Sequence, residues 1–493
     1  MGRDCAPFIL NSDSWILLFL TGRYEGIALK FEELPGIPGI WLDFLRSRIP
    51  ILSAPSSVKS LVAHADAVVG RRTKNNDLVR ALAGQEPDSS RVLEHIQRLG
   101  QPHSVAVVTE IHSGLFGGPV VHIIKCLTAI KLCEELVKEG VSAIPICWIN
   151  SDSPADFSNW SVSLLDADGE IHSMEISPGE TIPDHISDLI SQVGKFGGGD
   201  FDTEVLEILQ SAFRPGRSLS AASARLISAL TRQWGMIVFD PGAPEFRPII
   251  SRAVATLQAR NSEIQFLMQG TASTLAGLGY GSFSTTAIPA SLIQSLLFPV
   301  LVHVTDPFEI RSLANVLPVF EEIGRAQPIV WPEASATVGD VRCCRTLRRY
   351  SLSLAQLYSG EEEVLRTLRE ALPRAAAGKL RSIKSEVETR ISELKRLVSE
   401  EGGFSKTADS CKEKILYQID RLEHLLESAL NTKEHTASRH IHQACNFLAP
   451  HRRLQERELA AVQIPLRYAS EGLRHLYEKL DILSFEHQLI WMD

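Results

Sequence analysis

The sequence predicts an α/β protein in which a parallel β-sheet core is followed by a C-terminal α-helical coiled-coil hairpin. Runs of small or β-branched apolar residues, typical of buried strands, begin at Ser104, Val141, Gly235 and Val300. A glycine-rich turn and an apolar helix directly follow the first of these runs. Two long amphipathic segments occupy much of the last third of the chain.

With 493 residues, the chain is too long for one ordinary hydrophobic core. We expect an α/β core with a helical N-terminal segment and inserts over residues 1–375, an antiparallel coiled-coil arm over residues 376–440, and a C-terminal segment, residues 441–493, that returns to the core. A net charge of −9 and a pI near 6.0 give no general footprint for nucleic acid or an anionic membrane. We therefore expect neither as a partner.

Cysteine usage and the N-terminal segment both predict a cytoplasmic protein. The eight cysteines form no C-x-x-C pair, which is typical of reduced thiols rather than of a secreted disulfide framework. The apolar run at residues 15–20 is far shorter than the roughly 20 residues that span a bilayer. No basic region with a cleavage site precedes or follows it.

Residues 104–138 join a buried strand, a glycine-rich turn and a helix. Gly117 and Gly118 permit a tight turn, and Pro119 marks the start of the helix. In an open α/β sheet such a turn lies at the carboxyl edge of the strands, where ligands bind. The turn matches neither G-x-G-x-x-G nor G-x-x-x-x-G-K-[ST]. It is therefore either a structural turn or a site where the N–H groups of Gly117 and Gly118 hold an anion.

Three side chains near this turn are candidates for chemistry. His112 ends the strand, and His122 and Lys125 lie in the first two turns of the helix. Each of the two histidines is either a catalyst or a structural residue. Lys125 either holds a carboxylate or phosphate near the positive end of the helix, or is an exposed lysine, because it falls opposite the apolar stripe.

A second buried strand, residues 141–150, ends in polar side chains. Asn150 is the last residue of this strand and Asp152 lies just beyond it. Residues that bind ligands gather at the carboxyl ends of parallel strands. We therefore expect Asn150 to bind substrate and Asp152 to act in catalysis. The alternative is ordinary turn capping by Asn and Asp.

The remaining elements follow from periodicity and turn residues. Residues 160–175 alternate around a D-A-D-G turn and predict a hairpin, and residues 203–212 and 219–234 predict helices. Apolar residues recur at helical spacing over 380–398 and 415–429, on either side of a Gly-Gly pair at 402–403. Two helices joined at these glycines form an antiparallel hairpin, which either pairs with a second subunit or packs back on its own core.

Residues 109–119, which read TEIHSGLFGGP, resemble the signature T-G-Q-Q-x-G-L-F-G-G-P of the bacillithiol synthase family, the BshC cysteine ligases. Lys125 and the following TAI at 128–130 match the K-x-x-T-A-I that continues this signature. Further similar stretches follow in the same order: IPICWI at 144–149, DPFEI at 306–310, PVFE at 318–321 and LQER at 454–457. The resemblance runs roughly from residue 30 to the end of the chain.

This resemblance implies a Rossmann-like core and a ligase that joins L-cysteine to the amine of glucosaminyl-malate in the last step of bacillithiol formation. Amide formation from a free carboxylate needs activation, commonly by ATP, so ATP/ADP is the cofactor we expect, although the sequence leaves the cosubstrate open, and we predict no metal. Gln294 matches a glutamine of the family pattern, and we expect it to bind substrate together with Gly117, Gly118, Lys125 and Asn150. The coiled coil is expected to form a homodimer.

The chain also departs from the family pattern. Glu110-Ile111-His112 replaces G-Q-Q, and Ala290 stands at an arginine position, where alanine cannot supply a bidentate clamp. A histidine of the family's S-E-D-H-D-F stretch is missing after the second strand, so if that histidine is a base in the family, this chain either does without it or uses His112 in its place. The chain is thus either an active ligase or a catalytically silent relative that acts as a dimeric scaffold or regulatory subunit.

Overall fold

The computed structural model describes residues 27–49, 51–52, 54–55, 57–72, 75–85, 89–150, 160–196, 202–277, 288–371, 374–398 and 402–492. The chain divides into two compact units: a core unit, Met1–Val341 with Arg453–Asp493, and a helical unit, Arg342–Arg452. The helical unit begins at residue 342, so it includes residues that precede the coiled-coil arm expected over 376–440, and the chain returns to the core unit at residue 453. No helix in the described ranges is long and apolar enough to cross a membrane.

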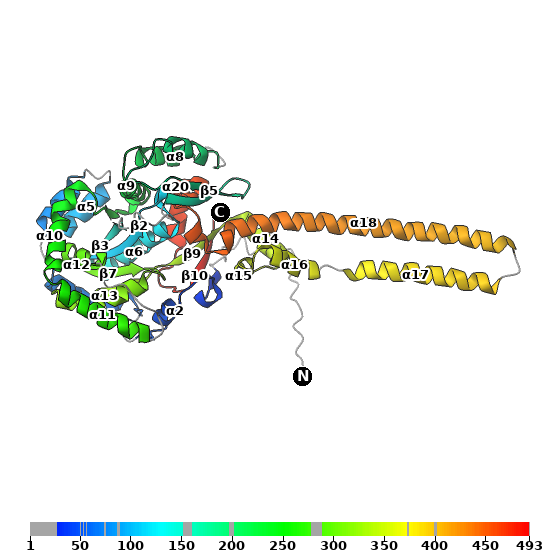
Figure 1. The fold of residues 1–493 in the computed structure, drawn as a ribbon, viewed down its shortest axis with the longest axis horizontal. Helices are drawn as coiled ribbons and strands as arrows, with labels where there is room; N and C mark the ends of the chain where they lie inside the picture. The colour runs from blue at the N-terminus through cyan, green and yellow to red at the C-terminus, as the bar shows by residue number, and fades with distance from the viewer. Residues whose placement is uncertain are drawn as a thin grey trace. The chain divides into compact units, whose positions relative to one another are not determined.

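The core unit is built on a parallel five-stranded sheet with strand order β6-β3-β2-β7-β8. Figure 1 labels its three middle strands, β3, β2 and β7. Its strands are β2 (Ser104–His112), β3 (Ser142–Asn150), β6 (Ile237–Phe239), β7 (Val300–Thr305) and β8 (Ile329–Pro332). Residues 104–109 of the central strand β2 are all fully buried, as the apolar run predicts. The α/β fold with a parallel sheet is confirmed, although β8 was not predicted.

Helices cover both faces of this sheet. On one face, α6 (Val121–Lys138) packs against β2 and β3, with α3 (Val58–Gly70) and α9 (Leu219–Thr231) beside it. The other face carries α4 (Asn76–Ala83), α5 (Ser90–Leu99), α10 (Arg247–Gln258) and α12 (Ala290–Leu297).

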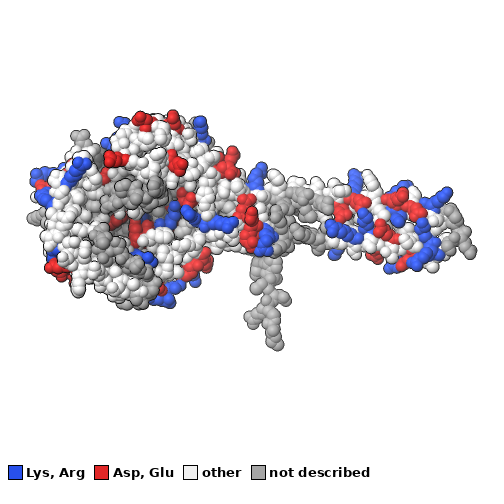
Figure 2. Space-filling view, viewed as in Figure 1, with Lys and Arg blue, Asp and Glu red and all other residues white. Residues whose placement is uncertain are grey.

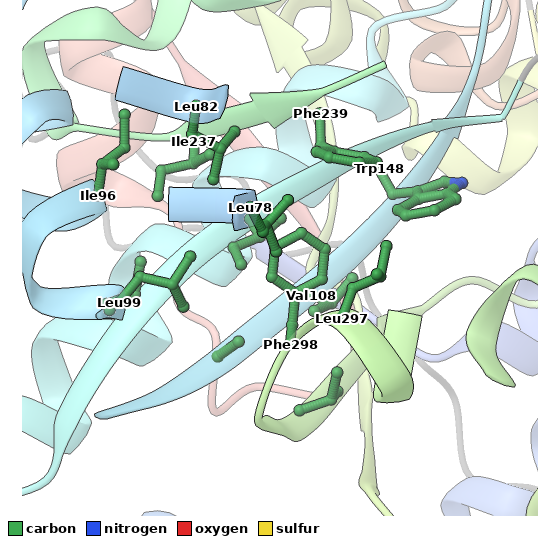
Figure 3. Packing of buried hydrophobic residues seen from close by; sticks show 14 of the residues in the cluster. Leu78, Leu82, Ile96, Leu99, Val108, Trp148, Ile237, Phe239, Leu297 and Phe298 are labelled. Atoms are coloured by element: carbon green, nitrogen blue, oxygen red, sulfur yellow. The ribbon is translucent and has the colours of Figure 1, made fainter. Parts of the chain in front are cut away.

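The core on this second face is one continuous apolar cluster (Figure 3). Trp148 and Phe239 stack with ring centroids 4.9 Å apart, and Phe298 meets Phe239 edge to face. Val108 of the central strand points into the same cluster. Because residues alternate along a strand, Glu110 continues this face beyond Val108, toward the carboxyl end of β2.

Two smaller sheets complete the core unit. The terminal strand β10 (His487–Trp491) runs parallel to β9 (Ser335–Gly339) and antiparallel to β1 (Ile27–Leu29). The predicted hairpin is confirmed as β4 (Ser161–Leu165) and β5 (Ile171–Glu175). Further helices of the unit are α2 (Gly39–Leu45), α7 (Ile186–Val193), α8 (Asp202–Ala212), α11 (Asn261–Gly277), α13 (Ile310–Glu322), α19 (Gln455–Glu458) and α20 (Gln463–Lys479).

The helical unit contains α14 (Val341–Tyr350, whose first residue belongs to the core unit), α15 (Leu354–Leu357), α16 (Glu361–Ala371), α17 (Arg374–Leu397) and α18 (Gly402–Leu448). Ion pairs join Arg381 to Glu423 and Lys395 to Asp409, so residues later in α17 meet residues earlier in α18. The predicted antiparallel coiled coil is therefore confirmed. Gly402 and its neighbour begin α18 and do not form the turn expected there.

Candidate active site

The carboxyl ends of the parallel strands lie together along one side of the sheet. We call this side, where the strands end, the sheet edge. His112 at the end of β2 lies opposite Asn150 at the end of β3, so the structure brings these two predicted residues together. His112 is exposed and Asn150 is half-buried. Asp306 follows β7 and Glu333 follows β8 at the same edge. The predicted catalytic Asp152 lies outside the described residues.

The glycine turn itself is buried and internally bonded. The N–H of Gly117 donates to the carbonyl of Gly114 at 3.1 Å, and the N–H of Gly118 donates to that of Leu115 at 3.0 Å. A Cβ at Gly117 would lie only 2.9 Å from Leu226 of α9. The expectation that these two N–H groups hold an anion is therefore wrong, because closing the turn already uses both of them.

His122 belongs to the same turn. Its Nδ1 lies 2.8 Å from the carbonyl oxygen of Gly117, a bond that requires a proton on Nδ1. Burial, aided by the positive charges of Lys125 and His112, lowers the pKa of His122 to about 3. A neutral imidazole that holds the turn carbonyl fits the structural alternative for this histidine.

Lys125 lies inside the protein, with only 1% of its side chain exposed, so the alternative of an exposed lysine is wrong. Its Nζ donates to Glu309 Oε2 at 2.6 Å and lies 3.6 Å from Asp306 Oδ2. Burial disfavours the ammonium, but the charges of Glu309 and Asp306 outweigh it and raise the pKa of Lys125. The carboxylates that pair with this lysine thus belong to the chain itself.

Arg457, from the C-terminal segment, extends this network. Its guanidinium donates to Glu333 Oε1 at 2.5 Å and lies 3.6 Å from Asp306 Oδ2. Asp306 therefore lies between two cations. Although burial opposes ionisation of Asp306, Lys125 and Arg457 lower its pKa well below the usual range. We call Lys125, Asp306, Glu309, Glu333 and Arg457 the buried charge network.

Glu309 is the most exposed member of the buried charge network, with 24% of its side chain exposed against 19% for Arg457. Burial and the negative charge of Asp306 raise the pKa of Glu309 to about 8, against the pull of Lys125. Burial also raises the pKa of Glu333 well above its usual range. A carboxyl group that exchanges its proton near neutral pH is suited to general acid–base chemistry.

Gln294, predicted to bind substrate, is fully buried on α12. Its Nε2 donates to Glu110 Oε1 at 2.8 Å, which ties α12 to the end of β2. The amide oxygen Oε1 of Gln294 has no hydrogen-bond partner.

Sequence reasoning selected only one member of the buried charge network, Lys125, and did not select Glu110. A signal was available, because Asp306, Glu309 and Arg457 all lie in the stretches that resemble the family pattern.

Neither a metal site nor a phosphate cradle emerges from the described residues of this edge. No group of three or more His, Cys, Asp or Glu side chains there is placed to hold a metal ion. Lys125 and Arg457 are both bound by carboxylates of the chain, and the turn N–H groups are engaged. These residues do not fit a nucleoside triphosphate at this turn, so we derive no step through one.

A surface groove of about 400 Å³ lies elsewhere on the core unit, along α11 and beside Pro318 of α13. Phe266, which lines it, is 75% exposed. None of the predicted site residues that the structure describes lines this groove. We therefore place the candidate site at the sheet edge.

The fold and the charged sheet edge define a Rossmann-like α/β protein with a coiled-coil domain. Residues 55–288 match the family model "Bacillithiol biosynthesis BshC, N-terminal Rossmann-like domain", and residues 336–492 match "Bacillithiol biosynthesis BshC, C-terminal coiled-coil domain". The chain therefore belongs to the BshC family, as the sequence motifs predicted.

Curated relatives are similar over most of their length. A protein of Koribacter versatilis is 23% identical over 94% of this chain and 99% of its own. Proteins of Solibacter usitatus and Natranaerobius thermophilus are 23% and 25% identical, each over 84% of this chain and 88% or 90% of their own. All three carry the name "Putative cysteine ligase BshC".

Proposed function

We propose that this protein is a cysteine ligase that joins the carboxyl group of L-cysteine to the amine of glucosaminyl-malate, the last step of bacillithiol formation. The observation that carries the proposal is the match of both units to BshC models, with relatives named as cysteine ligases over most of the chain. These names favour a ligase over the silent scaffold. The buried charge network adds a proton-exchanging carboxyl group, Glu309, at the sheet edge.

Within this proposal, the predicted residues take separate roles. His112 and Asp152 act on protons of the reacting groups, and Asn150 and Gln294 orient the substrates at the sheet edge. Lys125 acts through Glu309, whose carboxyl group it holds in place.

The proposed reaction needs an activated carboxyl group, and ATP is the cosubstrate we propose for that purpose. We also propose that the protein works in the cytoplasm, where thiols stay reduced. Cys126, Cys133 and Cys147 are buried free thiols, which is compatible with this compartment.

The direct test is to incubate the purified protein with glucosaminyl-malate, L-cysteine and ATP, and to detect bacillithiol by mass spectrometry. Omitting ATP tests the cosubstrate, and we expect no product without it. Absence of product in the complete mixture, with folded protein, would rule out the proposed function.

The roles of His112 and Asp152 need variants with matched controls. We expect His112→Asn and Asp152→Asn each to lower the rate by about 10²- to 10⁴-fold, the range for loss of a positioned acid or base. His185→Asn and Asp184→Asn make the same chemical changes at exposed positions before α7 and should leave the rate unchanged. A full rate in either site variant would exclude that residue from catalysis.

We also propose that the coiled coil forms a homodimer. Large apolar side chains are exposed on α17 and α18, among them Leu397, 81% exposed, and Leu425, 59% exposed. Light scattering should give a dimer for the intact chain and a monomer after Leu397→Ser with Leu425→Ser. Leu483→Ser removes a similarly exposed leucine of the core unit and should leave the dimer intact. An intact chain that is monomeric at micromolar concentration would contradict the proposal.

A further inference from the structure

Glu110 and Gln294 form a pair of acceptor groups at the sheet edge. Glu110 extends from the end of β2 and is half-buried. Gln294 extends from α12 and is fully buried. The bond from Gln294 Nε2 to Glu110 Oε1 fixes the carboxyl group at 2.8 Å from the amide.

The amide oxygen of Gln294 is the second observation at this position. This Oε1 is buried and has no hydrogen-bond partner, although buried polar atoms nearly always have one. It belongs to the same planar amide as the Nε2 that binds Glu110, so the unpaired oxygen lies close to the carboxylate. An unpaired buried acceptor costs free energy that a bound donor would recover.

The surrounding charges favour a cation. Lys125 is already bound by Glu309 and Asp306. Burial and Asp306 raise the pKa of Glu309 to about 8, and the negative charge of Glu110 adds to this rise. Ala290, one helical turn before Gln294, adds no positive charge to this face of α12.

We propose that Glu110 and Gln294 form a binding site for a protonated primary amine. An ammonium group carries three N–H donors and no acceptor, so it can donate to the Glu110 carboxylate and to the unpaired Gln294 oxygen together. The carboxylate supplies the negative charge, and the amide oxygen fixes the orientation of the ammonium group. A neutral amide or a hydroxyl group in the same place gains no charge-assisted bond.

Two substrates of the proposed reaction carry such a group, and in this respect the inference rests on the proposed function. One is the amine of glucosaminyl-malate and the other is the α-ammonium of L-cysteine. The site recognises the ammonium group that both substrates carry. Which substrate supplies the ammonium is decided by pairing each one with an analogue that lacks this charge.

Calorimetry on the full-length protein provides the test. In one arm, the affinity for glucosaminyl-malate is compared with that for its N-acetylated form, and in the other, L-cysteine is compared with 3-mercaptopropionate. We expect the wild type to prefer the ammonium form in one arm by about tenfold to 100-fold, the range for a hydrogen bond to a charged group. Glu110→Gln should abolish this preference and leave the affinity for the analogue that lacks the ammonium group unchanged.

Two further variants sharpen the test. Gln294→Met keeps the buried volume but removes the acceptor oxygen, and we expect it to reduce the preference without abolishing it. Glu139→Gln makes the same charge change at the exposed end of α6 and should retain the full preference. Thermal unfolding checks that each variant is folded.

The outcomes separate this inference from the proposed function. If Glu110→Gln retains the preference, or if the wild type shows none in either arm, the amine site is wrong, even when bacillithiol is formed. If the preference exists and Glu110→Gln removes it, the amine site stands, even when no bacillithiol is formed.

Discussion

Lys125 in the core unit and Lys395 in the helical unit make ion pairs of the same length in different surroundings. Each ammonium lies 2.6 Å from a carboxylate oxygen, of Glu309 and of Asp409 respectively. The side chain of Lys125 is 1% exposed, whereas that of Lys395 is 30% exposed and that of Asp409 is 49% exposed. Distance alone therefore does not rank these pairs, because burial decides the cost of leaving one charge without the other.

The two regions also use charge for different purposes. On the helical unit, positive and negative side chains are interspersed over the surface of the coiled coil (Figure 2), where water screens each pair. At the sheet edge, five ionisable groups share one buried network, and the pKa of Glu309 moves to about 8 as a result. The first arrangement keeps a surface solvated, and the second prepares groups for proton exchange.

The largest expected effect is that of Lys125→Met on stability. The change leaves Glu309 without its cation and Asp306 with Arg457 alone, and breaking a buried pair in this way costs about 3–5 kcal/mol. We expect the free energy of unfolding of the core unit, measured in urea, to fall by this amount. A loss below 1 kcal/mol would mean that the network is open to water. The pair of Lys125 would then contribute no more to stability than the exposed pairs of the helical unit.

The burial of Lys125 also marks the limit of what the sequence could predict. The strand, turn and helix over residues 104–138 follow from local pattern, and the structure has all three. The partners of Lys125 lie far away in sequence, at Asp306, Glu309 and, through the network, Arg457. No local periodicity reveals such partners, so helical spacing alone suggested an exposed lysine.

The missed strands have a different cause. β8 (Ile329–Pro332) is four residues long and ends in proline, and β9 (Ser335–Gly339) contains small residues with little apolar character. Both become buried only because β7 and β10 lie beside them. Short strands of this kind are defined by their neighbours and carry weak signals of their own.

The next effect is a dependence of stability on pH. The pKa of Glu309 is raised from 4.5 to about 8 in the folded protein, so the folded state keeps a proton that the unfolded state has lost. This stabilisation is present below pH 4.5 and is lost as the pH rises through 8. We expect the free energy of unfolding to fall by on the order of 1–3 kcal/mol between pH 5 and pH 8.5.

Glu309→Gln separates this contribution from others. The amide cannot ionise, so urea unfolding of this variant should lose less stability over the same pH range than the wild type does. An identical pH profile in the two proteins would show that Glu309 titrates normally and that its burial does not perturb it.

Two glycines give effects of opposite sign in the two regions. Gly118 has φ +70°, and a Cβ there would lie 2.6 Å from the His122 ring. Gly118→Ala should therefore lower the free energy of unfolding by about 1–3 kcal/mol, which thermal unfolding detects as a lower melting temperature. Gly378 lies in α17 with no atom within 4 Å of an added Cβ. Gly378→Ala should therefore stabilise the helical unit, by about 0.5–1 kcal/mol.

Gly216→Ala serves as the control for the turn, because its φ of +78° is similar but nothing lies near an added Cβ. Backbone strain alone acts there. If Gly118→Ala costs no more than Gly216→Ala, the contact with His122 contributes nothing, and the turn is less tightly packed than the core around it.

The smallest expected effect is that of Lys395→Met, the same chemical change as Lys125→Met in the exposed pair. Lysine and methionine have similar helix propensities, so the substitution mainly removes the bond to Asp409. Exposed pairs contribute about 0–1 kcal/mol, and we expect a loss within that range when unfolding of the helical unit is followed by circular dichroism. The same measurement at several protein concentrations tests whether dimerisation buries this pair, because a partner subunit that covers it would exclude water from it. A loss near that of Lys125→Met, seen only where the protein is dimeric, would show that the pair belongs to the buried class after assembly.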